Sequence, residues 1–432
     1  MISSMYTAVS GLNSEDAALS VIGNNIANQN TVGFKGSNTL FGDVLSAEVS
    51  GMQVGSGARV DNVTPQFTQG ALETTSNALD MAIEGNGFFV VNGSSGERYT
   101  RAGEFSMDKN GNVVDSQGDV LQGYQVDSSG NITGTIGNIN LTVSQIPPVA
   151  TSAVTMKLNL DSTSPVTAAF NLTGGSGGTP ANYGYSTTVK VYDVQGVAHQ
   201  VTAYFTNLGA TSTVNGTNVS PTSVDNWKAT YVYDNTSGTP TIAGTQNLYF
   251  TSSGALYSDS QDPAITFPFA TSQPITFDYG TATYDEGGTT GLDGTTQFAS
   301  DSAVENITAD GSPAGSLENY TLDKNGVISG TFTNGQKKTL GQVILANFDS
   351  PTNLQQLDGN LYAQTVDSGE ALIGKPQTGG LGSVNSGSLE ESNVDLSDQF
   401  VKMIAAQSGY EANSKMISTM DQLMQTLVNM KQ

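Results

Sequence analysis

Residues 4–28 read SMYTAVSGLNSEDAALSVIGNNIAN, and this stretch at the amino terminus decides the fold of the chain's ends. Its apolar side chains recur at steps of three, four and seven residues, so they share one face of a helix. The members of this stripe are Met5, Val9, Leu12, Leu19, Ile22 and Ile26. No proline precedes Pro65, so nothing interrupts a helix here. The pattern predicts one long helix from about Ser4 to Asn28.

The carboxyl terminus carries a second apolar stripe with heptad-like spacing. Its members are Leu396, Phe400, Met403, Tyr410, Ile417, Met420, Met424 and Leu427. This spacing predicts a long helix that can pair in a coiled coil. Ser392, followed three residues later by Asp395, has the spacing of a capping box, so we expect the helix to start there.

The middle of the chain carries strand patterns. Apolar and polar residues alternate at 189–192, 201–205 and 227–233, which predicts half-buried antiparallel strands. One local pattern occurs twice, at 105–113 and 320–328, and each copy contains Asp-Lys-Asn-Gly, a signature of a hairpin turn. Because the two copies lie far apart, we predict one β domain built from two chain segments, with an insertion between them.

Together these patterns predict a multidomain α+β protein, with long terminal helices that pair as a coiled coil in a polymer and two mainly antiparallel β domains in the middle. Pro147-Pro148 and the stretch that begins at Asp285 are the expected hinges of the insertion. The expected parts are a terminal coiled-coil domain (1–30 and 390–432), an extended connecting segment (31–75 and 380–389), a discontinuous first β domain (76–146 and 286–379) and an inserted outer β domain (147–285).

Composition excludes several classes of function. The chain has 39 acidic and 15 basic residues and a net charge of -24, which argues against binding to nucleic acid or to anionic lipid. It has no cysteine and one histidine, His199, so disulfides, iron–sulfur clusters and thiolate zinc sites are excluded. No apolar run approaches the ~18 residues that span a bilayer, and no basic residue precedes Lys35 as in a cleavable signal. We therefore expect no cofactor, no nucleic acid and no membrane insertion.

No pattern of catalytic residues stands out, so we do not expect an enzyme. The two Asp-Lys-Asn-Gly loops lack the glutamate that a calcium loop needs at its twelfth position, which favours plain turns. Glu390-Glu391 could serve a glycosidase, but a solvated helix start is the simpler interpretation. His199 is expected on a strand surface, because a catalytic role would need a serine and an aspartate brought to it by the fold. The sequence thus predicts no catalytic, cofactor-binding or metal residues.

The terminal helices are poorly supported on a lone chain. Burying the six apolar side chains of the first stripe stabilises it by at most roughly 9 to 18 kcal/mol, whereas ordering ~25 residues costs about 25 to 50 kcal/mol. Gly11, Gly23 and Gly409 each weaken a helix by about 1 kcal/mol more. We expect both ends to be largely disordered in isolation and to fold on assembly. The alternative is an ordinary helical hairpin packed on the β domain.

Several motifs appear in a fixed order at both ends of the chain. They lie at 4–12, 24–35, 85–89 and 388–396, with further matches from Gln407 to Asp421. In this order they resemble the bacterial flagellar rod and hook axial protein family. The resemblance covers about 1–145 and 290–432 and is weak in between. We expect the two apolar stripes to make subunit–subunit contacts, together with the motif residues Asn24, Asn25, Asn28, Phe34, Asn393 and Val394.

The resemblance implies a structural subunit of the flagellar hook, a flexible helical tube that transmits torque from the rod to the filament. The large insertion favours the hook over the rod, whose proteins have a short middle. The resemblance also implies a homopolymer, export by the flagellar type III apparatus and an extracellular place. Its further implied partners are the distal rod protein, the hook cap protein and the hook–filament junction protein. A distal rod protein and, in another class, a β-rich surface adhesin remain the alternatives.

Overall fold

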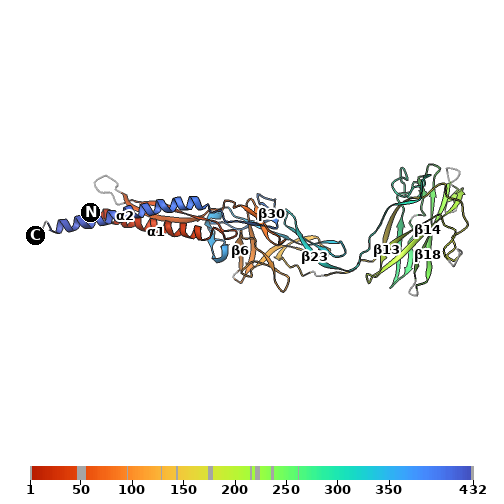
Figure 1. Ribbon diagram of the computed structural model, residues 1–432, viewed down its shortest axis with the longest axis horizontal. Coiled ribbons are helices and arrows are strands. Elements are labelled where there is room, and N and C mark those ends of the chain that lie inside the picture. The colour runs from red at the N-terminus through yellow and green to blue at the C-terminus, as the bar shows by residue number, and fades with distance from the viewer. Residues whose placement is uncertain are drawn as a thin grey trace. The chain divides into compact units, whose positions relative to one another are not determined.

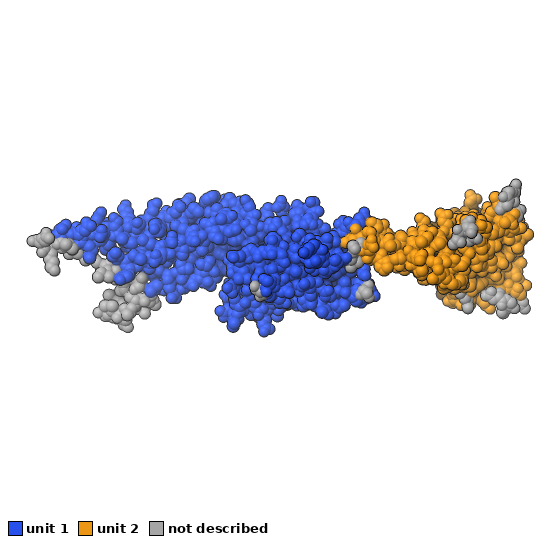
Figure 2. All heavy atoms as spheres, turned by 90° about the horizontal axis from the view of Figure 1, so that it is seen from below, with its two compact units in different colours: residues 1–144, 318–331, 337–432 blue, residues 145–317, 332–336 orange. Residues whose placement is uncertain are grey.

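The computed structural model is mostly β, with one long helix near each end of the chain. Contacts divide it into two compact units (Figure 2). Unit 1 comprises Met1–Ser144, Glu318–Thr331 and Lys337–Gln432, and unit 2 comprises Gln145–Leu317 and Phe332–Gln336. The structure describes residues 2–45, 55–94, 96–127, 129–142, 145–173, 179–214, 217–218, 224–234, 238–260 and 262–429.

In unit 1 the helices α1 (Ile2–Ala27) and α2 (Leu396–Asn429) lie side by side (Figure 1). The predicted amino-terminal helix is confirmed to within two residues at its start and one at its end. The predicted start of the second helix is wrong. The Asp395 Oδ1 atom accepts a hydrogen bond from Ser397 N at 2.7 Å, so Asp395 is the N-cap. Ser392 lies outside the helix, where its hydroxyl accepts only from Val394 N at 3.4 Å.

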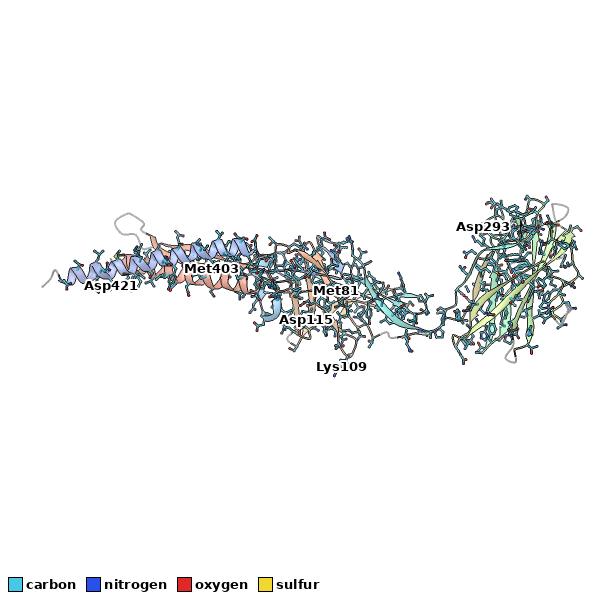
Figure 3. All side chains as sticks on the ribbon, viewed as in Figure 1. Met81, Lys109, Asp115, Asp293, Met403 and Asp421 are labelled. Atoms are coloured by element: carbon cyan, nitrogen blue, oxygen red, sulfur yellow. The ribbon has the colours of Figure 1, made fainter. Side chains whose placement is uncertain are left out.

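The two helices share a small apolar seam. Ala18 and Ile22 of α1 and Ala406 of α2 are buried there. The half-buried residues that pack against them are Leu19, Ile26 and Met403, the last of which is labelled in Figure 3. Next to α1 lies an antiparallel hairpin of β1 (Ser37–Leu45) and β2 (Gly55–Pro65).

The β region of unit 1 is built from both chain segments, as predicted from the repeated pattern. Its two small sheets pair β3 (Leu72–Thr74) with β31 (Ser388–Glu390) and β4 (Met81–Glu84) with β30 (Ser383–Ser386). Its main sheet contains β5 (Phe88–Gly93), β6 (Gly96–Thr100), β7 (Ser106–Met107), β8 (Val113–Val114), β9 (Val120–Val126), β10 (Ile132–Asn138), β23 (Gly315–Leu322), β24 (Val327–Phe332), β25 (Lys337–Val343), β26 (Leu345–Asn347), β27 (Gln355–Gln356), β28 (Leu361–Ala363) and β29 (Leu372–Gly374). The part of β23 from Glu318 on belongs to this unit. The short helices η1 (Pro351–Asn353) and η2 (Asp358–Asn360) lie in its loops.

Both copies of the Asp-Lys-Asn-Gly pattern form the predicted tight turns. The Asp108 Oδ1 atom accepts hydrogen bonds from Asn110 N and Asn112 N, both at 2.8 Å. In the second copy Asp323 makes the equivalent bonds. Gly111 and Gly326 have φ angles of 79° and 76°, which explains why each turn ends in glycine.

Unit 2 contains two sheets that share one apolar core. The five-stranded sheet has the order β13 (Tyr185–Tyr192), β14 (Ala198–Thr211), β17 (Val224–Asp234), β18 (Pro240–Phe250), β19 (Leu256–Ser258). The four-stranded sheet has the order β20 (Ile265–Pro268), β21 (Ser272–Asp278), β12 (Ala153–Asn159), β22 (Ala303–Ala309). The remaining strands are β11 (Gln145–Ile146), which pairs with the start of β23 (Gly315–Leu322), and the pair β15 (Thr213–Val214) and β16 (Thr217–Asn218). The three predicted strands are confirmed in β13, β14 and β17, which pair antiparallel, whereas β12 and β21 are parallel.

The insertion returns later than the predicted boundary at Asp285. Unit 2 runs on to Leu317, and the Asp285 carboxylate accepts a hydrogen bond from Ser258 Oγ at 2.6 Å inside it. The reason is β22, which pairs antiparallel with β12 and so completes the four-stranded sheet. The glycine-rich stretch that begins at Asp285 is therefore a turn inside unit 2 and not the boundary of that unit. The remaining predicted domain limits stay predictions.

Candidate assembly surface

A buried ion cluster joins the amino-terminal and carboxyl-terminal motifs inside unit 1. Lys35 Nζ lies 2.6 Å from Glu390 Oε1, and Arg101 Nη1 lies 3.5 Å from Glu390 Oε2. All three side chains are at most 4% exposed. Burial lowers the pKa of Lys35 and of Arg101, and the Glu390 charge opposes both shifts. The cluster holds two cations around one carboxylate.

The expectation of a solvated helix start at Glu390 is wrong, although Glu391 is exposed. Glu390 ends β31, whose pairing with β3 turns its side chain into the unit. There Gly70 N also donates to Glu390 Oε1 at 2.9 Å. Sequence reasoning missed this cluster. The available signal was a charged residue at the end of an otherwise uncharged motif, Thr31–Lys35.

Three of the motif residues expected at subunit contacts are used within the chain. Asn25 is 2% exposed; its Nδ2 donates to Ser37 O at 2.8 Å and to Gln399 Oε1 at 3.1 Å, so it ties α1 to β1 and α2. Asn393 donates to Gln66 O at 2.7 Å. Phe34 is buried. An amide side chain offers both donor and acceptor, which suits it to this internal role. Asn25 and Phe34 leave no surface for a neighbouring copy.

The other three motif residues also make contacts close to α1. Asn28 Nδ2 donates to Asn24 O at 3.0 Å, and Asn28 Oδ1 accepts from Thr31 Oγ1 at 3.1 Å. These bonds close the carboxyl end of α1. Val394 lies against Gly36, where an added Cβ would come within 3.1 Å of Val394 Cγ2.

The two stripes divide into a buried part and an exposed part. Ile22 is buried, and Leu12, Leu19, Ile26, Leu396, Met403, Ile417 and Met420 are half-buried. The exposed members are Met5, Val9, Phe400, Tyr410 and Met424. The side chain of Leu427 lies outside the described residues.

Further exposed apolar side chains lie outside the predicted stripes. Tyr6 is 71% exposed, Val401 67% and Ile404 62%. Sequence reasoning missed them because it assigned one apolar face to each helix. Adjacent apolar residues such as Phe400-Val401 were the signal for a wider apolar surface. We call the exposed stripe members together with these three residues the helix surface.

The described part of unit 2 holds a group of acidic residues that the sequence did not bring together. Carboxylate oxygens of Asp259, Asp262 and Glu286 lie within 4.8 Å of one another. Burial, and then the charges of Asp278 and Glu286, raise the pKa of Asp262. Burial likewise raises the pKa of Glu286. Nearby like charges thus add to burial in disfavouring the ionised forms of Asp262 and Glu286.

Among the described residues, no helix combines the length and apolar character needed to cross a bilayer.

Four family models match consecutive parts of the chain. The model described as flagella basal body rod protein matches residues 5–35, and that of the flagellar hook protein FlgE/F/G D1 domain matches 82–159. The flagellar basal body protein FlaE D2 domain matches 159–312, and the flagellar basal body rod FlgEFG protein C-terminal model matches 385–430.

Similar proteins match over the whole length. Flagellar hook protein FlgE of Salmonella typhimurium is 34% identical, over 99% of this chain and 100% of that protein. The chain belongs to the flagellar hook protein family. FlgE of Borreliella burgdorferi is also 34% identical and covers 100% of both chains. The predicted role is confirmed: the chain is a structural subunit located in the flagellar hook.

A solved structure supports the fold of this hook subunit. The crystal structure of Helicobacter pylori flagellar hook protein FlgE2 aligns with a TM-score of 0.51 at 14% identity, over 72% of this chain and 99% of that one. A mostly β chain with a helix near each end therefore matches a hook protein fold. The full-length matches favour the hook over the two alternatives, the distal rod protein and the surface adhesin.

Proposed function

We propose that copies of this hook subunit polymerise through the helix surface into a flexible helical tube that transmits torque from the rod to the filament. The observation that carries the proposal is the exposure of Tyr6, Val401 and Ile404 on the helix pair, outside the seam that the two helices share. Exposed apolar side chains concentrated on one pair of helices favour contact with a partner.

The helix pair has a reason to recruit further copies. Each helix presents apolar residues on more than one side, but a two-helix seam covers one side of each. A coiled-coil arrangement with neighbouring copies would cover the others. If the contacts are head-to-tail and do not close, the product is an open helical polymer. This agrees with a tube.

Several finer statements belong to the same proposal. We infer the distal rod protein, the hook cap protein and the hook–filament junction protein as partners at the ends of the polymer, and the flagellar type III apparatus as the export route to an extracellular place. Their support is the resemblance of the terminal motifs to the rod and hook family. We also propose the four-part division into domains that the sequence predicts, with the end of the inserted outer β domain moved from residue 285 to Leu317.

A pair of matched substitutions tests the helix surface. Val401→Asp should abolish or strongly reduce polymer, because the new charge would be buried between copies. Val366→Asp is the control, since Val366 is 99% exposed in unit 1 but lies on neither helix. Electron microscopy and sedimentation of the full chain measure polymer. Normal tubes from Val401→Asp, or equal loss from both variants, would contradict the proposal.

Truncation tests the same proposal more coarsely. Deleting residues 1–30 or 395–432 should leave a soluble protein that does not polymerise. The fluorescence of Trp227, the one tryptophan of the chain, shows whether unit 2 is still folded, because that residue is buried in its core. Tubes of normal appearance from either truncated chain would rule the proposal out.

A further inference from the structure

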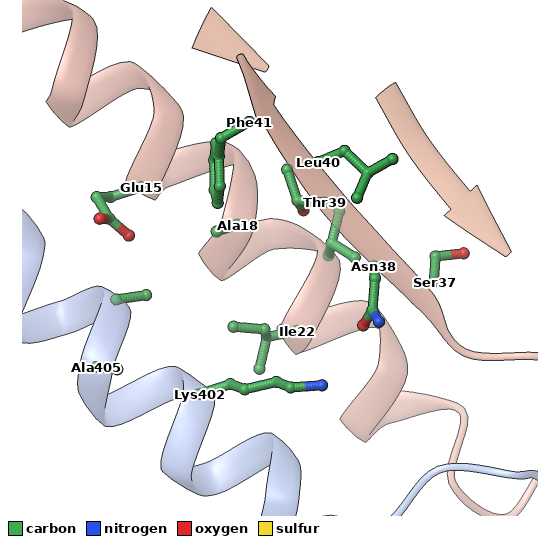
Figure 4. A pocket seen from close by; sticks show the side chains of 12 residues that line it. Glu15, Ala18, Ile22, Ser37, Asn38, Thr39, Leu40, Phe41, Lys402 and Ala405 are labelled. Carbon is green, nitrogen blue, oxygen red and sulfur yellow. The ribbon is translucent and has the colours of Figure 1, made fainter. Parts of the chain in front are cut away.

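An apolar hollow of about 420 Å³ lies beside the helix pair in unit 1 (Figure 4). Its lining includes Ala18 and Ile22 of α1 and Ala406 of α2. Phe41 of β1 forms a wall. Alanines on facing helices leave space that larger side chains would fill. Charged groups, Glu15 and Lys402, also line the hollow.

The carboxyl-terminal end of α2 is apolar and, within the described residues, has no helix of the same chain beside it. Gly11 lies against Asn413 and Gly409 lies against Glu15, which fixes an antiparallel register. Continued residue by residue, this register brings Ile2 level with Gln422. Residues 423–429 of α2 therefore extend past the start of α1 (Figure 1). We call them the α2 extension.

The α2 extension has the composition of a segment that packs against protein. Leu423 is 53% exposed and Met424 45%. From Met416 to Asn429 the one charged residue is Asp421, labelled in Figure 3, although the chain has a net charge of -24. Methionine side chains can also adapt to an irregular hollow.

We infer that the α2 extension of one copy occupies the hollow of a second copy of this chain. This inference rests on the proposed function, since it specifies which surfaces meet in the polymer. Met424 lies 19 residues beyond Ala405, another residue of the hollow, or about 28 Å along α2 at ~1.5 Å per residue. Two copies in the same orientation, shifted by roughly that distance along the helix axis and displaced sideways by one helix diameter (~10 Å), bring extension and hollow together.

This contact explains how the polymer can grow without closing into a ring. Extension and hollow are different surfaces of one molecule, so each copy offers one to the neighbour on one side and the other to the neighbour on the opposite side. Such a heterologous contact between translated copies repeats indefinitely. The apolar lining residues Ala18, Ile22 and Phe41 can receive Leu423 and Met424. Of the two charged lining residues, Lys402 is already paired with Asp398 at 2.8 Å.

Disulfide cross-linking tests the contact directly, because the chain has no cysteine of its own. The full chain with Leu423→Cys and Ala405→Cys should, when polymer is oxidised, give a ladder of covalent oligomers. Residues 405 and 423 lie on one helix about 27 Å apart, so they cannot bond within a chain. The matched control combines Leu423→Cys with Gln407→Cys, which lies roughly 200° round the helix from Ala405. The control pair should give no ladder.

Each outcome decides between the two proposals. A ladder from the first pair alone supports the inference. Equal ladders, or none from variants that form tubes, overturn it and leave the proposed function intact. If the unsubstituted chain forms no tubes, the proposed function fails first.

In a second measurement Leu423→Ser should raise the concentration of free chain beside the polymer at least about tenfold, as expected for losing a buried leucine. An unchanged concentration would also overturn the inference.

Discussion

The β sandwich of unit 2 and the helix pair of unit 1 bury apolar residues on very different scales. Among the described residues, twenty-two apolar side chains form the buried core of unit 2, with Trp227 and Phe205 fully enclosed. The cluster between the helices has three buried members, Ala18, Ile22 and Ala406. Large enclosed cores stabilise a fold on their own, whereas a thin seam does not. The chain thus separates a region with its own large core from a region that, in the proposed polymer, neighbouring copies would complete.

The largest expected effect comes from breaking the ion cluster. Glu390→Ala should destabilise unit 1 by about 3 to 5 kcal/mol, because it leaves Lys35 and Arg101 as buried cations without a counter-charge. Hydrogen exchange of peptides from β5 and β9 measures unit 1, and Trp227 fluorescence should show unit 2 unchanged. Glu391→Ala, at an exposed neighbour, is the control. Similar exchange in both variants would show that the cluster does not stabilise unit 1.

The same kind of truncation should act differently in the two regions. Leu158→Ala should lower the stability of unit 2 by about 2 to 5 kcal/mol, because it opens a cavity in an enclosed core. Denaturation followed by Trp227 fluorescence measures this loss. Ile22→Ala should leave that transition in place and instead raise the concentration of free chain beside the polymer. If Leu158→Ala changed only the concentration of free chain and Ile22→Ala lowered the stability of unit 2, the contrast between the core of unit 2 and the helix pair would be wrong.

Two glycines of α1 sharpen the account of the helix pair. An added Cβ at Gly23 meets nothing within 4 Å, so Gly23→Ala should stabilise α1 by about 1 kcal/mol. At Gly11 the Cβ would lie 2.7 Å from Asn413 Nδ2, so Gly11→Ala should lose most of that gain. Helix content of the full chain by circular dichroism, measured with polymer yield, tests both. Equal gains at both positions would mean that the helices do not pack closely at Gly11.

The smallest effect concerns the acidic group of unit 2. The folded state raises the pKa of Asp262, so its ionised form destabilises the fold at neutral pH but not below the unfolded pKa of about 4. Asp262→Asn should therefore stabilise unit 2 by about 0.5 kcal/mol or less at pH near ~7, with the gain fading as the pH falls through ~4. Trp227 fluorescence at both pH values measures it. Asp301→Asn, at an exposed position, is the control. A gain independent of pH would contradict this cause.

The success of sequence reasoning differs between these features for physical reasons. The terminal helices, the alternating strands and the two Asp-Lys-Asn-Gly turns were predictable, because each depends on residues a few positions apart. The N-cap was misassigned because Ser392 and Asp395 both suit that role and only backbone geometry separates them. The disorder of the ends in a dilute chain stays a prediction, for which hydrogen exchange of α1 and α2 is the measurement.

The sequence by itself determined which segments are helices and strands and that the apolar stripes lie at both ends, since periodicity is a local property. The tertiary structure alone decided that Glu390 is buried between Lys35 and Arg101, that Asn25 and Phe34 face inward, and that a hollow lies beside α1. Those facts depend on residues hundreds of positions apart meeting in space. Periodicity says which face of an element is apolar, but only packing shows which part of that face stays exposed.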